Sequence, residues 1–383
     1  MPDFLNFIKI NILKCLNEKT GILVLFLVWL FSQVIAYFHF GVMKSVDSQY
    51  YINTAASIAL GEFPQNREIF YLTYSSLIAL LSLIGLEATW VVIPQVAISG
   101  MALYSIYRIT QIISKNTLTP FVASLLYILW FKFQQWNLIV YTDTLFTNSA
   151  VISVYFLMIA KNKRNYLTAM VIIVFTIFIR PTGLGFFFAI LSYLLYDKLL
   201  VNNKLVFKVL GLTLLLGFFL VVINEVLRDF VASFLQSYSV AEIIYPKIPL
   251  EIDKPDSLNI PNSQHQPLVQ LLLFMVKNPY YMIKISLLKV ILLLGHIKPY
   301  YSLIHNIMIG CFLYPVYFFA IKGVSSVSKS KLSVFILVFL GFQIITVSIT
   351  SENWDGRFLF PLLPWIFILS SFGISNALQR RYS

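Results

Sequence analysis

The feature that most constrains this chain is a series of long apolar runs. They follow one another along 383 residues, and charged residues lie mainly in the segments between them. Only 11% of the residues are charged, whereas soluble domains carry about 25%. A run of about 20 apolar residues matches the thickness of a bilayer, so we expect an all-α polytopic integral membrane protein. The runs are Gly21–Phe38, Tyr71–Leu86, Trp90–Tyr107, Leu118–Trp136, Leu145–Ala160, Tyr166–Ile179, Leu184–Tyr196, Leu205–Ile223, Leu268–Leu294, Tyr301–Ile321, Leu332–Thr350 and Phe358–Ala377.

The distribution of basic residues predicts how these runs are oriented. If the N-terminus is cytoplasmic and both Tyr71–Leu86 and Leu268–Leu294 stay on the outer side, ten spans remain. Sixteen of the 28 Lys and Arg residues then lie in short cytoplasmic segments, as the positive-inside rule requires. If those two runs crossed instead, the basic segment Lys161–Arg164 would face outward. We therefore predict about 10 transmembrane helices plus outer juxtamembrane helices, with both termini cytoplasmic, in the plasma or inner membrane.

The same pattern predicts a single transmembrane domain over residues 1–383, without a separate soluble domain. Gly21–Phe38 has no small-residue cleavage site and is predicted to be a retained first span. Residues 39–89 form the first outer loop with its juxtamembrane helices. Residues 225–300 form a long outer loop with an interfacial helix, because Lys277, Lys284 and Lys289 lie among leucines there and Pro279 interrupts the run.

Several kinds of site are not indicated. Cys15 and Cys311 are far apart and suggest neither a disulfide framework nor a thiol site. The four histidines show no metal-ligand spacing, and no phosphate-binding loop or nucleotide fold is indicated. A divalent metal stays open, whereas nucleotide and haem cofactors are not expected. The net charge of +12 suits anionic headgroups rather than nucleic acid.

Asp47 is the acid that follows the first run. It opens a helical pattern in which Tyr51, Ala55, Ile58 and Ala59 share one face, which predicts an amphipathic helix at the bilayer surface. Aspartate is a favoured N-cap, so Asp47 could cap this helix, take part in chemistry, or do both.

Arg180 lies between two runs that the basic loops force into a hairpin, with Arg180-Pro181-Thr182-Gly183 at its turn. Each arm of about 14 residues reaches about 21 Å, which is less than the hydrocarbon thickness of about 30 Å. The turn is therefore predicted to be sunk below the outer surface, where an arginine needs a cavity or an anion. Binding of a phosphate is favoured over snorkelling to headgroups.

Asp143 and Arg357 fall on the same predicted outer side. Asp143 follows an aromatic and polar stretch and is either the N-cap of the next helix or a second carboxylate near Asp47, in a metal site or a shared-proton pair. Arg357 lies in a polar loop and either contacts an anion or pairs with Glu352 or Asp355.

With these stretches placed, the chain resembles the GT-C superfamily of polyprenyl-phosphate-sugar-dependent glycosyltransferases, which includes the protein O-mannosyltransferases and the aminoarabinose transferase of lipid A. Asp47-Ser48-Gln49-Tyr50-Tyr51 with Ala55-Ala56 looks like the acidic motif of the first outer loop, and Phe70-Tyr71-Leu72-Thr73-Tyr74 echoes the opening of the outer helix. Asp143 looks like the acid of the second outer loop. Arg180-Pro181-Thr182-Gly183 and Arg357-Phe358-Leu359-Phe360-Pro361 look like the basic turn and the late arginine element. Many relatives carry a second acid directly after the first, where this chain has Ser48.

The resemblance implies a GT-C-like fold and inverting transfer of a hexose or pentose from a polyprenyl-phosphate donor, outside the cytoplasm, to a lipid, glycan or protein acceptor. Asp47 would be the catalytic base. Tyr50, Tyr51, Asp143, Arg180 and Arg357 would bind substrate. The expected partners are the lipid-linked donor, membrane lipids and the acceptor, without nucleic acid.

Two other classes stay open. In a transporter or a flippase of lipid-linked sugars, Arg180 and the carboxylates would line a translocation path. No internal repeat supports this, and the polar residues gather at one face. A non-catalytic assembly protein of the cell envelope would tolerate replacement of Asp47 and Arg180.

Overall fold

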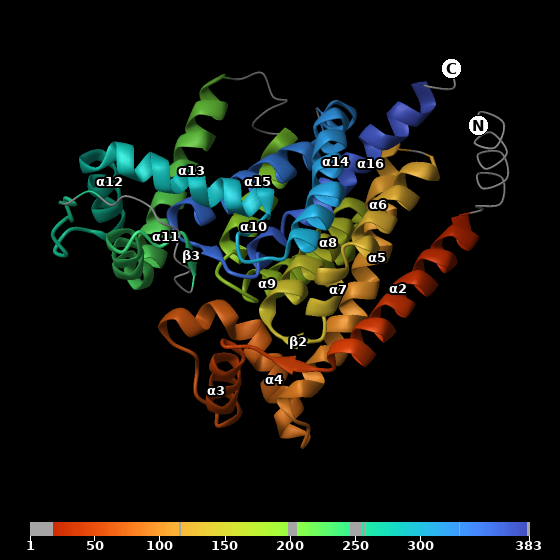
Figure 1. The fold of residues 1–383 in the computed structure, drawn as a ribbon, viewed down its shortest axis with the longest axis horizontal. Coiled ribbons are helices and arrows are strands. Elements are labelled where there is room, and N and C mark those ends of the chain that lie inside the picture. Colours follow the sequence, from red (N-terminus) through yellow and green to blue (C-terminus); the bar gives the residue numbers. More distant parts are fainter. Residues whose placement is uncertain are drawn as a thin grey trace. The chain divides into compact units, whose positions relative to one another are not determined.

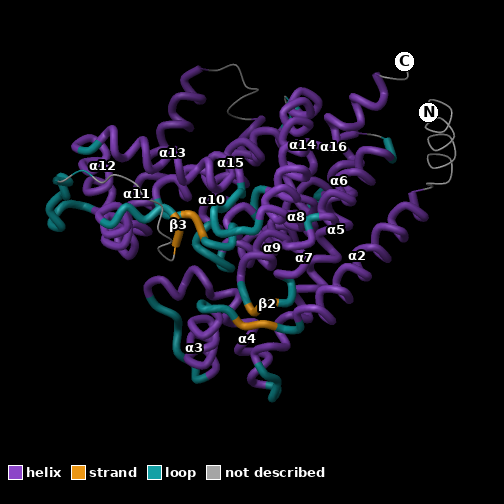
Figure 2. The backbone as a smooth tube through the Cα atoms, in the orientation of Figure 1, coloured by secondary structure: helices purple, strands orange, loops and turns teal. Residues whose placement is uncertain are grey.

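The computed structural model describes residues 18–114, 116–197, 205–245, 255, 257–328 and 330–380. Helices account for most of these residues, and the strands among them are two residues long (Figure 1). Figure 2 shows the strands as short segments between the helices. The predicted all-α class is therefore confirmed. Cys15 and the predicted cytoplasmic N-terminus before Glu18 lie outside the described residues.

The chain divides into two compact units. The first comprises Met1–Phe187, Tyr314–Ser333 and Phe360–Ser383, and the second comprises Phe188–Leu313 and Val334–Leu359. Three helices pass from one unit into the other: α10 (Gly183–Tyr196), α14 (Leu303–Val327) and α15 (Lys331–Ile349).

The first unit contains both predicted outer-loop acids. Its other elements are α2 (Glu18–Phe40), β1 (Met43–Lys44), α3 (Ser48–Ala59), η1 (Asn66–Tyr71), α4 (Leu72–Leu83), η2 (Ala88–Val91), α5 (Val92–Ser114), α6 (Leu118–Leu129), α7 (Phe131–Trp136), β2 (Ile139–Val140), α8 (Thr142–Ile159), α9 (Lys163–Ile177) and α16 (Leu363–Arg380).

Helix α8 is the most enclosed of the candidate spans, because 72% of its apolar window is buried. It packs against α5 and α9, while α5 also packs against α6 and α2. The outer helix α2 buries one face through Leu25, Trp29 and Ala36 and exposes large apolar side chains such as Phe31 on the other. A helix that is apolar on its exposed face suits contact with lipid.

Close helix packing in the first unit uses small residues. A Cβ at Gly323 of α14 would overlap the carbonyl oxygen of Leu369 in α16, and a Cβ at Gly373 would overlap that of Phe319. Glycine is therefore required at this crossing, as in many pairs of membrane helices.

The second unit is built on the long helix α11 (Leu205–Ser239), which packs against α12 (Pro267–Lys277). It also contains α13 (Pro279–Gly295), η4 (Arg357–Leu359) and the parallel pair β3 (Ile244–Tyr245) and β4 (Glu352–Asn353). The apolar core of this unit includes Val231, Leu235, Tyr238, Ile244, Phe274, Tyr281 and Ile285.

The number of candidate spans differs from the prediction of ten. Among the described residues, five helices are long and apolar enough to cross a membrane, and the number is six if the pair α12 and α13, bent by 104°, forms one span. Those five are Glu18–Phe40, Ala88–Ser114, Thr142–Ile159, Leu303–Val327 and Lys331–Ile349. The chain is therefore a multi-pass, membrane-associated protein with fewer full-length spans than expected.

Helix length accounts for three of the predicted spans that are not found, namely Leu118–Trp136, Tyr166–Ile179 and Leu184–Tyr196. The apolar run Leu118–Trp136 breaks at Trp130, where ψ is 76°, into helices of 12 and 6 residues. Helices α9 and α10 have 15 and 14 residues. At about 1.5 Å per residue, such helices reach about 20 Å, which is less than a hydrocarbon core of about 30 Å.

Candidate functional site

Two loops far apart in sequence meet at Asp47. Strand β1 pairs in parallel with β2, so Lys44 lies opposite Val140. Just after β1, the Ser48 hydroxyl donates to the carbonyl oxygen of Val140 (2.7 Å) and accepts from the Ser45 N–H (2.8 Å). These bonds hold the start of α3 beside the segment that leads into α8, and therefore hold Asp47 and Asp143 in the same region of the first unit.

The side chain of Asp47 is not used to cap α3. Asp47 occupies the N-cap position, but its carboxylate makes no hydrogen bond to the N–H groups of the first turn. The residue is partly exposed, whereas Ser48 beside it is buried. Capping therefore does not account for the acid at this position.

A layer of tyrosines lies next to Asp47. The ring of Tyr51 is buried, and its centroid lies 5.1 Å from that of Tyr71, 5.2 Å from that of Tyr74 and 5.5 Å from that of Tyr141. The more exposed Tyr50 contacts Tyr71 at 5.6 Å. Sequence reasoning placed Tyr50 and Tyr51 here, but it missed the rings that support them.

The carboxylates of Asp47 and Asp143 both act on Tyr51. Burial raises the pKa of the Tyr51 phenol well above its ordinary value, and the charges of Tyr71, Asp143 and Asp47 raise it further. The Thr142 hydroxyl hydrogen-bonds to the Tyr51 hydroxyl and opposes that shift. The Tyr51 phenol therefore stays neutral. Asp47 precedes Tyr51 in the sequence and Asp143 follows it, but both carboxylates lie near its ring.

Asp143 is not the N-cap of α8, because Tyr141 occupies that position and Asp143 lies in the first helical turn. Its side chain is fully buried and forms an ion pair with the Nη1 atom of Arg180, which is 7% exposed. The Arg180 guanidinium also lies 5.9 Å from the centroid of the Phe146 ring. The Arg180 side chain is thus buried within the protein, and its ion-pair partner within the chain is the carboxylate of Asp143. The predicted depth of the hairpin turn in the membrane stays a prediction.

The turn that carries Arg180 is fixed by a backbone hydrogen bond, by a close approach at Gly183 and by contacts of the preceding helix α9. The Gly183 N–H donates to the Arg180 carbonyl (2.8 Å), which closes the turn between α9 and α10. A Cβ at Gly183 would overlap the carbonyl oxygen of Ile177, so the turn requires glycine. The Thr73 hydroxyl donates to the Phe175 carbonyl (2.8 Å), which docks α4 on the end of α9.

A buried polar network holds the segment before Asp143 in place. Gln95 of α5 donates to the carbonyls of Asn137 (3.0 Å) and Ile139 (2.9 Å) and accepts from the Tyr74 hydroxyl (2.8 Å). The remaining members are Gln33, Ser99, Tyr127, Gln134 and Asn148. Polar residues within apolar helices are costly unless they are satisfied, so this network specifies the position of the segment. Gln33, Gln95 and Ser99 interrupt predicted apolar runs, and that signal could have revealed it.

Arg357 belongs to the second unit, in η4. It is 9% exposed, and its backbone N–H donates to the Asp355 carboxylate (3.2 Å). Its guanidinium lies 5.5 Å from the centroid of the Phe358 ring. The backbone hydrogen bond does not test the predicted pairing of the Arg357 guanidinium with Asp355, which stays a prediction. The hydrogen-bonded ion pair of Glu352 is with Lys298 rather than with Arg357.

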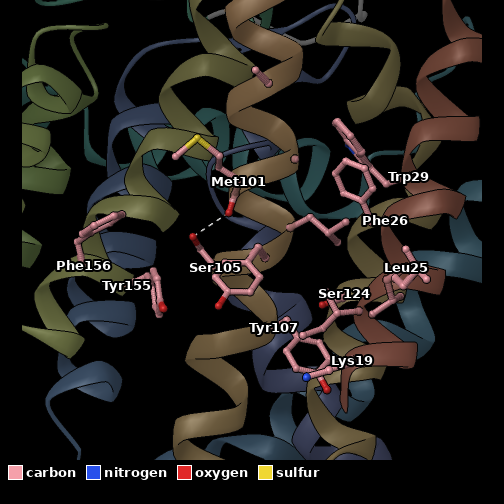
Figure 3. Close-up of a pocket in the computed structure, with 16 residues that line it drawn as sticks. Lys19, Leu25, Phe26, Trp29, Met101, Ser105, Tyr107, Ser124, Tyr155 and Phe156 are labelled. Atoms are coloured by element: carbon pink, nitrogen blue, oxygen red, sulfur yellow. Dashed lines mark hydrogen bonds between the residues drawn. The ribbon is translucent and has the colours of Figure 1, made fainter. Parts of the chain in front are cut away.

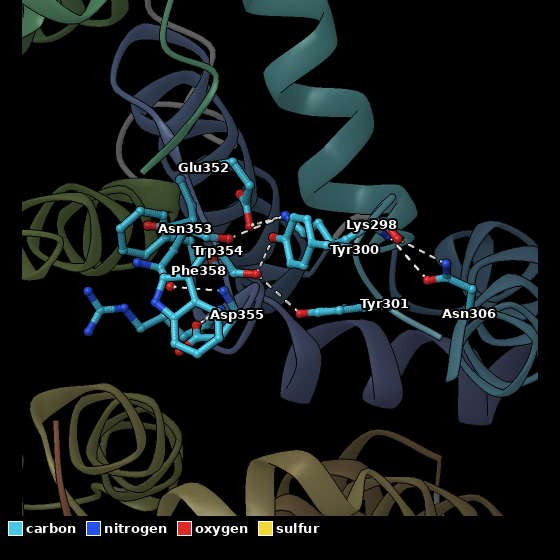
Figure 4. Close-up of polar contacts among 11 residues, drawn as sticks. Lys298, Tyr300, Tyr301, Asn306, Glu352, Asn353, Trp354, Asp355 and Phe358 are labelled. Carbon is cyan, nitrogen blue, oxygen red and sulfur yellow. Dashed lines mark hydrogen bonds and ion pairs between the residues drawn. The ribbon is translucent and has the colours of Figure 1, made fainter. Parts of the chain in front are cut away.

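The Lys298–Glu352 pair was not predicted. Both side chains are fully buried, and Lys298 Nζ donates to Glu352 Oε1 (3.2 Å) and to the Asn353 carbonyl (3.3 Å) (Figure 4). Burial raises the pKa of the Glu352 carboxyl to about 7 although Lys298 opposes the shift, and burial lowers the pKa of Lys298. The pair ties the loop after α13 to the loop that carries Arg357.

Within the described ranges, no group of three or more His, Cys, Asp or Glu side chains is placed to hold a metal ion. Comparison of the chain with models of protein families, with curated proteins and with solved structures gave no match.

Proposed function

We propose that this protein is a membrane glycosyltransferase that moves a sugar, with inversion, from a polyprenyl-phosphate donor to a lipid, glycan or protein acceptor on the extracytoplasmic face. One observation supports this most. The partly exposed carboxylate of Asp47 lies beside a layer of tyrosines, and the buried Asp143–Arg180 pair lies near the same tyrosines.

The reaction divides into two tasks. An acceptor hydroxyl oxygen bonds to the anomeric carbon while the bond from that carbon to the donor phosphate oxygen breaks. A base takes the hydroxyl proton, and positive charge stabilises the departing phosphate. Both tasks are met by side-chain types in the first unit.

Burial assigns the two acids to different tasks. Asp143 is fully buried and its charge is already offset by Arg180, so it is a poor candidate to take a proton from an acceptor. Asp47 is partly exposed at the start of α3, so an acceptor can approach it. We therefore assign the base to Asp47 and treat Asp143 as the residue that positions Arg180.

Arg180 supplies the positive charge for the phosphate. A guanidinium has five N–H donors in a planar fork, so it can bind two anions at once. The phosphate would then share Arg180 with Asp143. Arg357 in the second unit is an independent candidate for an anion contact. The exposed ring of Tyr50, supported by Tyr71, would contact the sugar.

Transfer is tested with purified, reconstituted protein and a panel of synthetic radiolabelled polyprenyl-phosphate sugars, with membrane extract as the source of acceptor. We expect label to move from one donor into a new product with the wild type and not with Asp47→Asn. Asp229→Asn, the same change in the second unit, should retain wild-type transfer. Label that crosses the vesicle membrane on an unaltered donor would instead identify a flippase.

A further inference from the structure

A pocket of about 850 Å³ lies among the membrane-spanning helices of the first unit, away from the tyrosine layer. Its walls come from α2, α5 and α8, with Ser124 contributed by α6. Phe26, Trp29 and Met101 line its apolar part (Figure 3). Because Leu23, Phe26 and Met101 are exposed, this pocket is a groove that opens at the surface of the helices.

The length of the groove matches one leaflet of a bilayer. Along α2 it extends from Lys19 to Trp29. Ten residues of helix cover about 15 Å, and half of a hydrocarbon core is also about 15 Å. The groove is apolar and opens at the side of the membrane-spanning helices α2, α5 and α8. Its opening therefore faces the hydrocarbon chains of the lipids rather than water.

One end of the groove is polar and carries net positive charge. Lys19 and the Tyr107 hydroxyl lie together there (Figure 3). Arg108 adjoins this end through a hydrogen bond to Tyr155 of the lining, and it pairs with Glu18 at 2.8 Å. Among the described residues, these two cations and one anion leave an excess of one positive charge where the apolar groove ends.

We propose that this groove binds an anionic phospholipid, with one acyl chain between α2, α5 and α8 and its phosphate beside Lys19. Basic pockets between membrane helices bind anionic headgroups, and the apolar part of the groove, lined by Phe26, Trp29 and Met101, supplies the site for the chain. In the predicted topology, Lys19 lies at the cytoplasmic surface, so this is a lipid of the inner leaflet. The site is separate from Asp47 and does not depend on the proposed transfer reaction.

The test is native mass spectrometry of the purified full-length protein titrated with phosphatidylglycerol and with phosphatidylcholine of the same acyl chains. We expect tighter binding of phosphatidylglycerol, and Lys19→Gln should weaken that binding about fivefold, which is the contribution of one basic residue at an anionic surface. Ala97→Trp, which places a large ring in the groove, should weaken binding of both lipids. Ile93→Trp, at an exposed position of α5 outside the lining, should bind as the wild type does.

Photolabelling adds a second measurement that does not depend on variants. Phosphatidylglycerol with a diazirine in its acyl chain should label the wild type within residues 22–29 or 97–107. Equal affinity for the two lipids, or labelling confined to other helices, would overturn the proposal. Lys19 is exposed, so Lys19→Gln should fold as the wild type does. If Ala97→Trp fails to fold, Lys19→Gln still tests whether the positive charge contributes to lipid binding.

Discussion

At the scale of single residues, the two acids of the first unit differ in environment although their sequence contexts look alike. Each stands at the start of a helix that follows one strand of the parallel pair β1–β2. Asp47 is partly exposed, and Asp143 is sealed in an ion pair. A buried carboxylate with a fixed guanidinium partner positions charge, whereas an accessible carboxylate can exchange a proton with an acceptor.

The Asp143–Arg180 pair leads to a stability prediction. Asp143→Asn leaves the buried Arg180 guanidinium without its counter-charge, so we expect a loss of about 3–5 kcal/mol in the free energy of unfolding. The double variant Asp143→Asn/Arg180→Met should lose less, because no uncompensated charge remains. Thermal unfolding of the detergent-solubilised protein measures both.

The control for that experiment is the exposed pair Arg228–Glu225, with side chains 64% and 54% exposed. Glu225→Gln should change the free energy of unfolding by at most about 1 kcal/mol. If Asp143→Asn were as stable as Glu225→Gln, the buried pair would not be the electrostatic anchor described above.

Glu352 leads to a pH prediction. Its pKa is about 7 in the folded protein and 4.5 when unperturbed, so between these values the unfolded chain releases a proton that the folded chain keeps. This group therefore makes the protein progressively less stable as the pH rises from about 4.5 to about 7. Glu352→Gln combined with Lys298→Met should remove that part of the decline in a series of unfolding measurements from pH 4.5 to 8. A double variant that keeps the full wild-type decline would mean that Glu352 is already ionised in the folded protein.

At the scale of elements, the turn between α9 and α10 connects backbone geometry to the site. Gly183→Ala would force its new methyl group into the Ile177 carbonyl, so we expect a loss of about 1–3 kcal/mol in stability together with reduced transfer activity. Gly341→Ala is the matched control, because nothing lies within 4 Å of a Cβ there and α15 should tolerate alanine. Equal stability of the two variants would show that the turn does not depend on glycine.

The sequence predicted most helices but not their interruptions. The runs Gly21–Phe38 and Trp90–Tyr107 correspond to α2 and α5, because apolar length and flanking charge define a span. The break at Trp130 has no Gly or Pro nearby, so it leaves no local signal. It arises where the buried network around Gln134 and Asn137 draws the chain out of the helix.

The sequence predicted the residues of the candidate site but not the contacts between them. The predicted common topological side, which follows from counting loops, suggested that Asp47 and Asp143 lie near one another, and both carboxylates are close enough to act on the Tyr51 phenol. The pairing of Asp143 with Arg180, 37 residues apart, depends on how α8 and α9 pack. Spacing along the chain carries no information on that contact, and the same holds for Lys298 and Glu352.

At the scale of the whole molecule, the membrane topology decides on which side of the membrane the Asp47 site lies, and labelling of single cysteines tests it. In a variant with Cys15→Ser and Cys311→Ser, we expect a membrane-impermeant maleimide to label Glu62→Cys on intact cells, because residues 39–89 are predicted to lie outside. Lys163→Cys should be labelled only after permeabilisation, since its loop is predicted to be cytoplasmic. Labelling in the opposite order would place the Asp47 site inside the cell and exclude the extracytoplasmic reaction.

The central claim is that Asp47 is the base of a transfer reaction, and the most direct measurement compares donor binding with transfer in Asp47→Asn. The isosteric amide keeps the shape of the site but cannot take a proton. We expect donor affinity within about twofold of the wild type and a rate of transfer lower by a factor of about 10² to 10⁴, the range of general-base catalysis. Transfer at the wild-type rate by a correctly folded Asp47→Asn protein would contradict the account.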